Sequence, residues 1–418
     1  MRKQICVGVV LVAAATGLLG CTEYEDSEEA TARELARLRS LPYGGGTHAG
    51  EDDSVGVVLL DTRYACPGYR LYAMQMLGRA ELIDLEGNVV REWQYPGDRW
   101  ERAELLANGD LLVVGMEGHG SVGGQRWRRS IVDSSRYVMR LDWEGRLVWK
   151  RKLLAHHDVE LTPAGKILVL TFRLQDEPDI HATIDTRADY LTLLDCNGNV
   201  EESRSLLEAI RNSPEVFDLD VSNAKPSRLG AVPWVDPLHA NSVEWMHQEH
   251  LFDTHPLYGS DNVLVCFRHQ DRVAVFDWEE NKVVWAWGAD ELSGPHDAQV
   301  LESGNVLVFD NGLTHRRSRA VEVDPLRDRI VWESPADSLG PFFTISKGSA
   351  QRLPNGNTLL AESDKGRAVE IAPEGRVVWE FLCPHGVASL KRAAIVRMIH
   401  YPAAFLDGRV TANVSTER

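Results

Sequence analysis

The sequence predicts an all-β fold: a six-bladed β-propeller of four-stranded blades, closed into a ring by N- and C-terminal strands. Two observations predict it. One hairpin pattern recurs six times along the chain, and a second hairpin pattern is interleaved with the first. Two hairpins make one four-stranded blade, and neighbouring copies recur about every 50 residues, as in known propellers.

The first hairpin consists of a strand, a turn that carries Asp or Gly, and a second strand that ends near a tryptophan. Alternating apolar and polar residues around such a turn are typical of a β-hairpin. The copies occupy residues 82–93, 140–149, 193–203, 275–287, 322–332 and 370–379, and 193–203 is the weakest. We interpret the tryptophans at the hairpin ends as contributors to blade packing rather than as a ligand cage. They are Trp93, Trp149, Trp285, Trp332 and Trp379.

The second hairpin is less uniform. Its copies occupy residues 105–114, 161–170, 301–309 and 353–361, with a poorer copy over 259–267. The hairpin that ends at Trp379 is not followed by a second hairpin, so we expect N-terminal strands near residues 57–60 and 69–76 to complete that blade. Residues 202–226 form an insertion, in which the apolar spacing predicts a short helix over 206–210.

The chain begins with a targeting segment, which we predict to be a lipoprotein-type signal peptide over residues 1–20. Arg2 and Lys3 precede an apolar run that ends at Leu19. This run is shorter than the roughly 20 residues that a membrane-spanning helix needs. A small residue and Cys21 follow directly, so we expect cleavage before Cys21 and acylation of its sulfur. The alternative is an ordinary signal peptide followed by a chance cysteine.

Residues 21–50 are predicted to be a polar, lipid-anchored tether with helical spacing over 28–41, and residues 51–418 the propeller domain. Thr22, rather than Asp, follows the acylated cysteine, which favours sorting to the outer membrane. We therefore expect an exported lipoprotein at the periplasmic face of the outer membrane or at the cell surface. The lipid would be its contact with the membrane.

Charge and cysteine content narrow the possible partners. The formal net charge is −17, and it becomes −19 without residues 1–20, because these carry two basic residues and no acidic one. An acidic surface argues against nucleic acid or an anionic membrane as a partner. The cysteines of the body form no CxxC pair, so one disulfide and buried free thiols both stay open, as does the oligomeric state. They are Cys66, Cys196, Cys266 and Cys383.

Alignment of the repeats with one another suggests a ring of histidines. Counting eight residues back from the turn glycines Gly165 and Gly304 gives His157 and His296. The motif around His239 aligns the irregular copy with them. Equivalent blade positions form a ring around the propeller axis, so we expect the three imidazoles to converge at one end of the central channel. A lone histidine would more often be structural, whereas three at one repeat position favour a functional site.

Further polar residues accompany the histidines. Asn241 follows His239 by two residues, and Arg268 ends a strand. Lys347 directly precedes the ring position of another copy, which Gly348 occupies, and Glu101 occupies it in yet another copy. Each polar residue alone is more often a surface charge or an inter-blade hydrogen bond. Together they describe a cationic, donor-rich pocket that suits an oxyanion such as sulfate or phosphate.

The aspartates beside two of the histidines have two interpretations. Asp158 and Asp297 are either turn-forming or cap residues, or they orient an imidazole tautomer. His156, His157 and Asp158 together could bind a metal, but no further carboxylate–histidine spacing completes a site. We therefore expect neither a metal nor another cofactor.

Several phrases, in this order, resemble one family. They are Pro67-Gly68-Tyr69, His156-His157-Asp158, His239-Ala240-Asn241-Ser242, Pro295-His296-Asp297-Ala298, Phe309-Asp310-Asn311-Gly312 and Leu353-Pro354-Asn355-Gly356-Asn357-Thr358. Over roughly residues 56–401 the chain is similar to the bacterial aryl-sulfate sulfotransferases, propeller enzymes that use no nucleotide sulfate donor.

The resemblance implies a six-bladed propeller with its site in the channel. It also implies a histidine nucleophile that is transiently sulfated, and His296 is similar to that residue. The catalytic residues that it implies are His296, His157, His239 and Arg268, and the substrate-binding residues are Asn241, Lys347 and His156. Gly348 follows the lysine where the family pattern has a hydroxyl, which is a departure from that pattern.

The sequence thus predicts an enzyme, an aryl sulfotransferase that moves a sulfuryl group from an aryl sulfate to a phenol through a sulfohistidine. Its partners would be these two small molecules. Two alternatives stay open, because a fold does not fix a function. One is a non-catalytic propeller that binds a ligand or a protein at the same rim. The other is a hydrolase that cleaves sulfate or phosphate esters with water as the acceptor.

Overall fold

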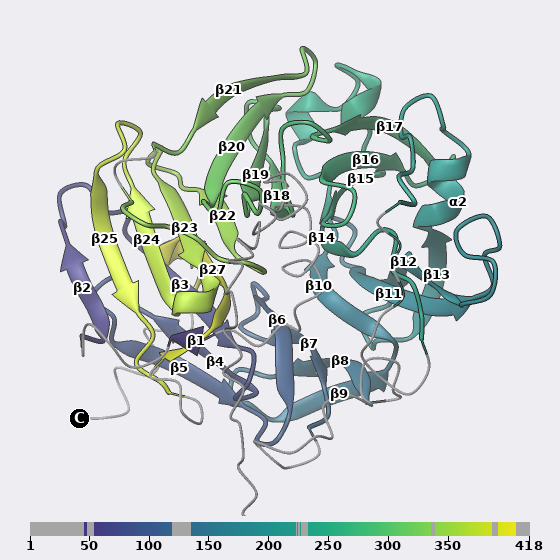
Figure 1. Ribbon diagram of the computed structural model, residues 1–418. Coiled ribbons are helices and arrows are strands. Elements are labelled where there is room, and N and C mark those ends of the chain that lie inside the picture. The colour runs from purple at the N-terminus through teal and green to yellow at the C-terminus, as the bar shows by residue number, and fades with distance from the viewer. Residues whose placement is uncertain are drawn as a thin grey trace, which may run out of the picture.

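The structure, a computed structural model, is nearly all β, and its sheets stand like blades around a central axis (Figure 1). It describes residues 46–47, 54–118, 135–222, 224, 226, 233–335, 339–386 and 392–406. Within these residues six antiparallel blades are formed, which confirms the predicted six-bladed propeller. The predicted signal peptide, Cys21 and most of the tether lie outside the described residues. No helix in the described ranges is long and apolar enough to cross a membrane.

We number the blades along the chain and give the strands of each from the channel outward. Blade 1 contains β27 (Ile395–Tyr401), β3 (Tyr69–Met74), β4 (Arg79–Ile83) and β5 (Val89–Gln94). Blade 2 contains β6 (Arg99–Leu105), β7 (Leu111–Met116), β8 (Arg136–Leu141) and β9 (Leu147–Lys152). Blade 3 contains β10 (Ala155–Leu161), β11 (Ile167–Gln175), β12 (Thr186–Leu194) and β13 (Val200–Ser205).

The second half of the ring follows the same order. Blade 4 contains β14 (Ala240–Trp245), β15 (Asn262–Phe267), β16 (Arg272–Asp277) and β17 (Lys282–Trp287). Blade 5 contains β18 (His296–Val300), β19 (Val306–Asp310), β20 (Arg319–Asp324) and β21 (Arg329–Glu333). Blade 6 contains β22 (Ser349–Arg352), β23 (Thr358–Glu362), β24 (Arg367–Ile371), β25 (Val377–Leu382) and, as a fifth strand, β2 (Gly56–Leu60). A separate pair joins β1 (Gly46–Thr47) to β26 (Arg392–Ala393).

Short helices lie in the connections. They are α2 (Leu206–Arg211) and the 3₁₀ turns η2 (Glu249–Leu251), η3 (Pro256–Tyr258), η4 (Ser363–Lys365) and η5 (Ala403–Phe405). Helix α2 confirms the helix expected in the insertion. Ser205 caps it by accepting the N–H of Glu208, and its apolar face is buried.

The ring closes differently from the expectation. The blade that ends near Trp379 already has its own inner hairpin, β22–β23, and β2 only extends its outer edge. The expectation that β3 completes that blade is therefore wrong. In blades 2 to 6 the two inner strands come before the two outer strands along the chain. In blade 1 the chain supplies only β3, β4 and β5 at its start, so the innermost strand is missing there. The C-terminal strand β27 supplies it, pairing Tyr401 with Tyr69 and Met398 with Tyr72.

The tryptophans join neighbouring blades, as predicted. The indole N–H of Trp93 donates to the carbonyl of Asp142 in the outer turn of the next blade (3.0 Å). Trp149 and Trp379 repeat this contact with the carbonyls of Cys196 and Leu85. A partly buried hydrogen bond of this kind contributes about 1 kcal/mol. The indoles therefore fasten the ring rather than line a ligand cage.

Inner strands also clasp one another across the blade boundaries. A side-chain oxygen on one inner strand accepts a backbone N–H of the next strand around the ring. The pairs are Asp158–Val243 (3.0 Å), Ser242–Ala298 (3.2 Å), Asp297–Ala350 (3.0 Å) and Ser349–Met398 (3.3 Å). Asp158 and Asp297 also pair with Arg397 (both 3.0 Å). These aspartates therefore hold blades together, and their side chains contact arginines and backbone N–H groups rather than an imidazole.

The cysteines among the described residues are free thiols. Cys66, Cys266 and Cys383 are buried, and Cys196 is exposed. The sequence left open one disulfide or free thiols, and the structure has free thiols at these four residues.

Candidate active site

The predicted site residues lie where the inner strands of blades 3, 4 and 5 begin. The ladder pairs fix which residues are equivalent. The pairs are Val159–Val169, Val243–Val265 and Ala298–Val308. Two residues before the first member of each pair stand His157, Asn241 and His296. We call this place the site position.

The expectation that His239 shares this position is wrong, because Asn241 occupies it. The error has a physical cause: in blade 4 the inner strands are joined by a long connection with two 3₁₀ turns, so no turn glycine marks the register. In the regular copies, Gly165 and Gly304 adopt φ of 75° and 85°, a left-handed conformation that glycine accepts readily.

His239 nevertheless joins the cluster from the loop that precedes β14. Its ring lies 5.0 Å from that of His157, centroid to centroid. Both residues have left-handed backbone angles, with φ of 52° and 57°. Such angles are strained for residues other than glycine and are found preferentially at functional sites. In His239 the strain is supported by its backbone N–H, which donates to Asp236 Oδ1 (2.8 Å).

His296 is held in one tautomer by Asn311. The Asn311 amide nitrogen donates to the carbonyls of Thr344 (2.9 Å) and Lys347 (3.0 Å), which uses both of its hydrogens. Its Oδ1 must therefore accept, and it lies 2.7 Å from His296 Nδ1. Nδ1 carries the proton, so Nε2 carries the lone pair. The backbone N–H of Lys347 donates to this Nε2 (3.2 Å).

His157 is held by a buried neighbour. A guanidinium can only donate, so the 2.8 Å contact between Arg187 Nη2 and His156 Nδ1 makes that nitrogen an acceptor. His157 Nδ1 lies 2.8 Å from the same atom and is therefore the donor of that pair. His156 is fully buried between these groups and Asp189. It supports the imidazole of His157 from behind.

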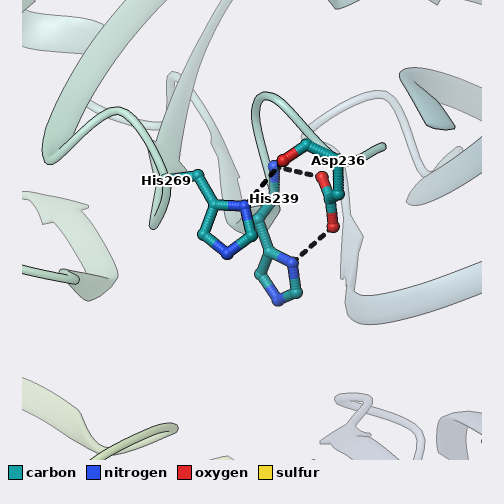
Figure 2. A group of neighbouring side chains, drawn as sticks. All are labelled: Asp236, His239 and His269. Carbon is teal, nitrogen blue, oxygen red and sulfur yellow. Dashed lines mark hydrogen bonds and ion pairs between the residues drawn. The ribbon is translucent and has the colours of Figure 1, made fainter. Parts of the chain in front are cut away.

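His239 is held by a carboxylate. Its Nδ1 donates to Asp236 Oδ2 (2.6 Å), and Figure 2 shows Nε2 pointing away from this contact. The same carboxylate oxygen accepts from Arg187 Nη1 (2.9 Å). All three imidazoles are thus fixed at Nδ1.

Two cations stand beside the imidazoles. Arg268 is 1% exposed, and its backbone N–H donates to the carbonyl of His239 (3.2 Å). Lys347 is also buried, has φ of 60°, and its Nζ lies 3.8 Å from Asp364 Oδ1. Burial, and then the charge of Arg268, hold the pKa of His296 well below its usual value. The site therefore combines neutral imidazoles with fixed positive charge, which suits an anion.

His269 was not predicted. It follows Arg268, and its ring lies 4.5 Å from the ring of His239. Its Nδ1 donates to the carbonyl of Asp236 (2.7 Å), and Arg268 Nη1 donates to its Nε2 (3.2 Å). Two further residues were missed in their roles: Asp236, three residues before His239, and Asn311, inside one of the phrases that carry the family resemblance. The spacing of Asp236 from His239 was the available signal.

Asp236, His239 and His269 come close enough to suggest a metal centre (Figure 2), since one ligand atom of each lies within 4.8 Å of the others. The existing hydrogen bonds argue against it. Both oxygens of Asp236 already accept from His239, and two guanidinium groups, those of Arg187 and Arg268, would repel a divalent cation. We interpret the group as a hydrogen-bond network.

Comparison with known proteins identifies the family of this chain. The family model described as Arylsulfotransferase (ASST) matches residues 134–383, more than half of the 418 residues. The match spans the site residues of blades 3 to 6. No curated protein matches the chain.

Solved structures of other proteins superimpose on this chain. A protein of unknown function from Bacteroides caccae superimposes with a TM-score of 0.50 at 15% identity, over 80% of this chain and 98% of that one. A nidogen/laminin complex superimposes with a TM-score of 0.46 at 11% identity, over 79% of this chain and 97% of that one. At such identities the first likeness bears on the fold alone.

Proposed function

Because the chain belongs to the arylsulfotransferase family, we propose that it transfers the sulfuryl group of an aryl sulfate to a phenol through a sulfohistidine on His296. The observation that carries this proposal is the fixed tautomer of His296. Asn311 holds the proton on Nδ1, so Nε2 carries the lone pair, in a site with positive charge for a sulfate ester. This lone pair accepts only a long hydrogen bond from the Lys347 backbone N–H (3.2 Å), which must open for attack on sulfur. A buried, neutral imidazole of this kind is a nucleophile at neutral pH.

The reaction has two displacement steps. In the first, the Nε2 lone pair of His296 attacks sulfur, the N–S bond forms, and the S–O bond to the aryl group breaks with its electron pair on the aryl oxygen. In the second, the oxygen of an acceptor phenol attacks sulfur, and the N–S bond breaks with its pair returning to Nε2. A covalent intermediate divides one difficult displacement into two easier ones.

Charge stabilisation would come from the groups around His296. Arg268 can bind sulfuryl oxygens through its planar guanidinium, and the backbone N–H of Lys347 already points at Nε2. Asn241 donates one Nδ2 hydrogen to the carbonyl of Pro295 (2.8 Å), and its second Nδ2 hydrogen is the donor that it can offer to a sulfuryl oxygen. Fixed donors of this kind lower the barrier because they need no reorganisation during the reaction.

Incubation with 4-nitrophenyl sulfate, with and without a phenol, tests the proposal. We expect nitrophenol release that depends on the phenol, and a sulfated phenol as the second product. Brief exposure without acceptor should add the mass of one SO3 group to the intact protein, mapped to His296 at neutral to alkaline pH. Release without a phenol would favour hydrolysis, and binding without release would favour a non-catalytic propeller.

A further inference from the structure

We propose that Asp236 and His239 form a proton-transfer dyad for the sulfuryl transfer. In this assignment His239 gives a proton to the departing aryl oxygen and later takes one from the acceptor phenol. Asp236 is the positioning residue that holds His239 for this task. The inference rests on the proposed function, since without sulfuryl transfer there is no phenol to protonate.

The three imidazoles differ in what holds their Nδ1. His296 donates to a neutral amide and His157 to a neutral imidazole, whereas His239 donates to the carboxylate of Asp236 (2.6 Å). A carboxylate on Nδ1 stabilises the imidazolium that forms when Nε2 accepts a proton. The amide and the imidazole carry no charge with which to do so. This difference in partner divides the roles: His296 is built to form a bond to sulfur, and His239 to exchange a proton.

The charges that face His239 set the balance between its two forms. Burial first, and then the charges of His269, Arg268 and His296, hold its pKa well below the usual value. The Asp236 carboxylate acts in the opposite sense and favours the imidazolium. Its effect is reduced because Asp236 Oδ2 also accepts from the guanidinium of Arg187. A bound sulfate ester brings a negative charge to Arg268 and so favours the imidazolium. The proton is therefore most strongly held when substrate occupies the site.

Protons and electrons balance over the cycle. His239 is neutral in the free enzyme and takes up a proton from solvent at Nε2 when the sulfate ester binds. In the donor step, the S–O bond breaks with its pair on the aryl oxygen, and this proton moves to that oxygen, leaving a neutral phenol and a neutral His239. In the acceptor step, the phenol gives its proton to His239 Nε2 as its oxygen attacks sulfur. The N–S bond breaks with its pair on His296, and the enzyme returns to its starting state.

Other groups fit this role less well. Lys347 has its pKa lowered by burial and is held against Asp364. His269 receives a donated hydrogen from Arg268 at Nε2, so its lone pair is engaged by a cation. His157 has the Glu101 carboxylate at its backbone N–H (3.0 Å), and this charge acts to raise its pKa against the larger effect of burial. Its ring Nδ1, however, donates to a neutral imidazole that Arg187 contacts (2.8 Å) rather than to a carboxylate.

The test compares two donors that differ in their need for a proton. Nitrophenolate leaves readily without protonation, whereas phenolate, whose conjugate acid has a pKa of about 10, benefits from it. We expect Asp236→Asn to slow sulfohistidine formation from phenyl sulfate by about 10²- to 10⁴-fold, the range of general acid catalysis, and from 4-nitrophenyl sulfate by less than about 10-fold. Single-turnover kinetics followed by intact mass measure both rates.

Asp189→Asn is the matched control. Asp189 is a second buried carboxylate beside Arg187, but it contacts His156 and the backbone N–H of Ala240 rather than His239. Any loss in this variant should be equal for the two donors. Equal losses for the two donors in Asp236→Asn would overturn the dyad, while transfer by the wild type would still support the proposed function. A wild type that transfers from neither donor would instead overturn the proposed function.

A measurement without variants covers a failure of Asp236→Asn to fold. In the wild type, the rate with phenyl sulfate should fall as pH rises through the pKa of His239 in the substrate complex, because the acid form is lost. The rate with 4-nitrophenyl sulfate should change by less than about 10-fold over the same interval. Parallel pH profiles for the two donors would contradict the dyad.

Discussion

Two neighbouring positions on the inner strands behave in opposite ways. The position directly before Val159, Val243, Ala298 and Ala350 holds Asp158, Ser242, Asp297 and Ser349 in blades 3 to 6, and each accepts a backbone N–H of the next blade. We call it the clasp position. One residue earlier, the site position holds His157, Asn241, His296 and Gly348 in the same blades.

The difference shows how one repeat supports both stability and chemistry. In blades 3 to 6 the clasp position carries a short side chain with an oxygen, because each of these boundaries presents the same N–H. In blade 2 the position holds Arg102, which donates to Asp158 Oδ1 instead (2.9 Å). The site position faces a different neighbour in each blade and is free to vary. A residue that repeats around the ring therefore belongs to the fold, and one that changes is available for function.

Exchange of one residue from each position tests this division most strongly. His296→Asn should abolish sulfuryl transfer and the covalent adduct, because no nucleophile remains, and should leave the free energy of unfolding nearly unchanged. Ser242→Ala should do the reverse: it leaves the N–H of Ala298 buried without its acceptor, which costs about 1–3 kcal/mol, while transfer continues. Turnover, intact mass and denaturant unfolding measure these effects.

The comparison breaks if the two effects do not separate. An adduct in His296→Asn would move the nucleophile to another residue. A large loss of stability in the same variant would mean that the site position also serves the fold.

Arg268→Lys tests whether the residues at the site position need a planar cation beside them for sulfuryl transfer. Lysine keeps the charge but loses the fork that can hold two sulfuryl oxygens. Loss of one transition-state donor predicts a fall in turnover of about 10²- to 10³-fold. Arg173→Lys is the control, because Arg173 is exposed and lies over the ring of Tyr190 (4.4 Å). Equal turnover in both variants would make Arg268 a blade contact only.

Much of the fold could be predicted from the sequence, because hairpins are local. The outer hairpins, the stacking tryptophans and helix α2 each depend on residues close together in the chain. Ring closure does not: β27 and β3 are separated by most of the sequence, and the pairing of Tyr401 with Tyr69 follows only from the order of hairpins within a blade.

The site was predicted less completely, and for the same reason. His157 and His296 were found because turn glycines mark their register, whereas His239 was aligned to a position that Asn241 occupies. Asp236 and Asn311 matter through what they contact, and a carboxylate three residues from a histidine is too common a pattern to assign a role. Contacts between distant loops decide which imidazole is held by an amide and which by a carboxylate.

The smallest effect that we expect is on stability in acid. The buried histidines of the site should lower the free energy of unfolding as pH falls, whereas Ser242 at the clasp position does not titrate and should not. Burial is the first cause that holds the pKa values of His157, His239 and His296 well below that of a free imidazole, about 6.5. Below that pH the unfolded chain binds protons that the folded chain refuses, so stability is lost as pH falls from about 6.5 toward the folded pKa values. Each such histidine contributes at most about 1.4 kcal/mol per pH unit.

His296→Asn isolates one of these contributions. Buried carboxyls such as Asp189 and Asp236 have pKa values raised by burial and act in the opposite sense, but they are common to the wild type and the variant. We therefore expect the free energy of unfolding of the wild type to fall more steeply between about pH 6.5 and pH 5 than that of His296→Asn, by up to one proton. Ser242→Ala should keep the wild-type slope at a lower stability. Identical slopes for the wild type and His296→Asn would mean that His296 titrates normally, and a normal pKa would remove the argument that it is a neutral, buried nucleophile.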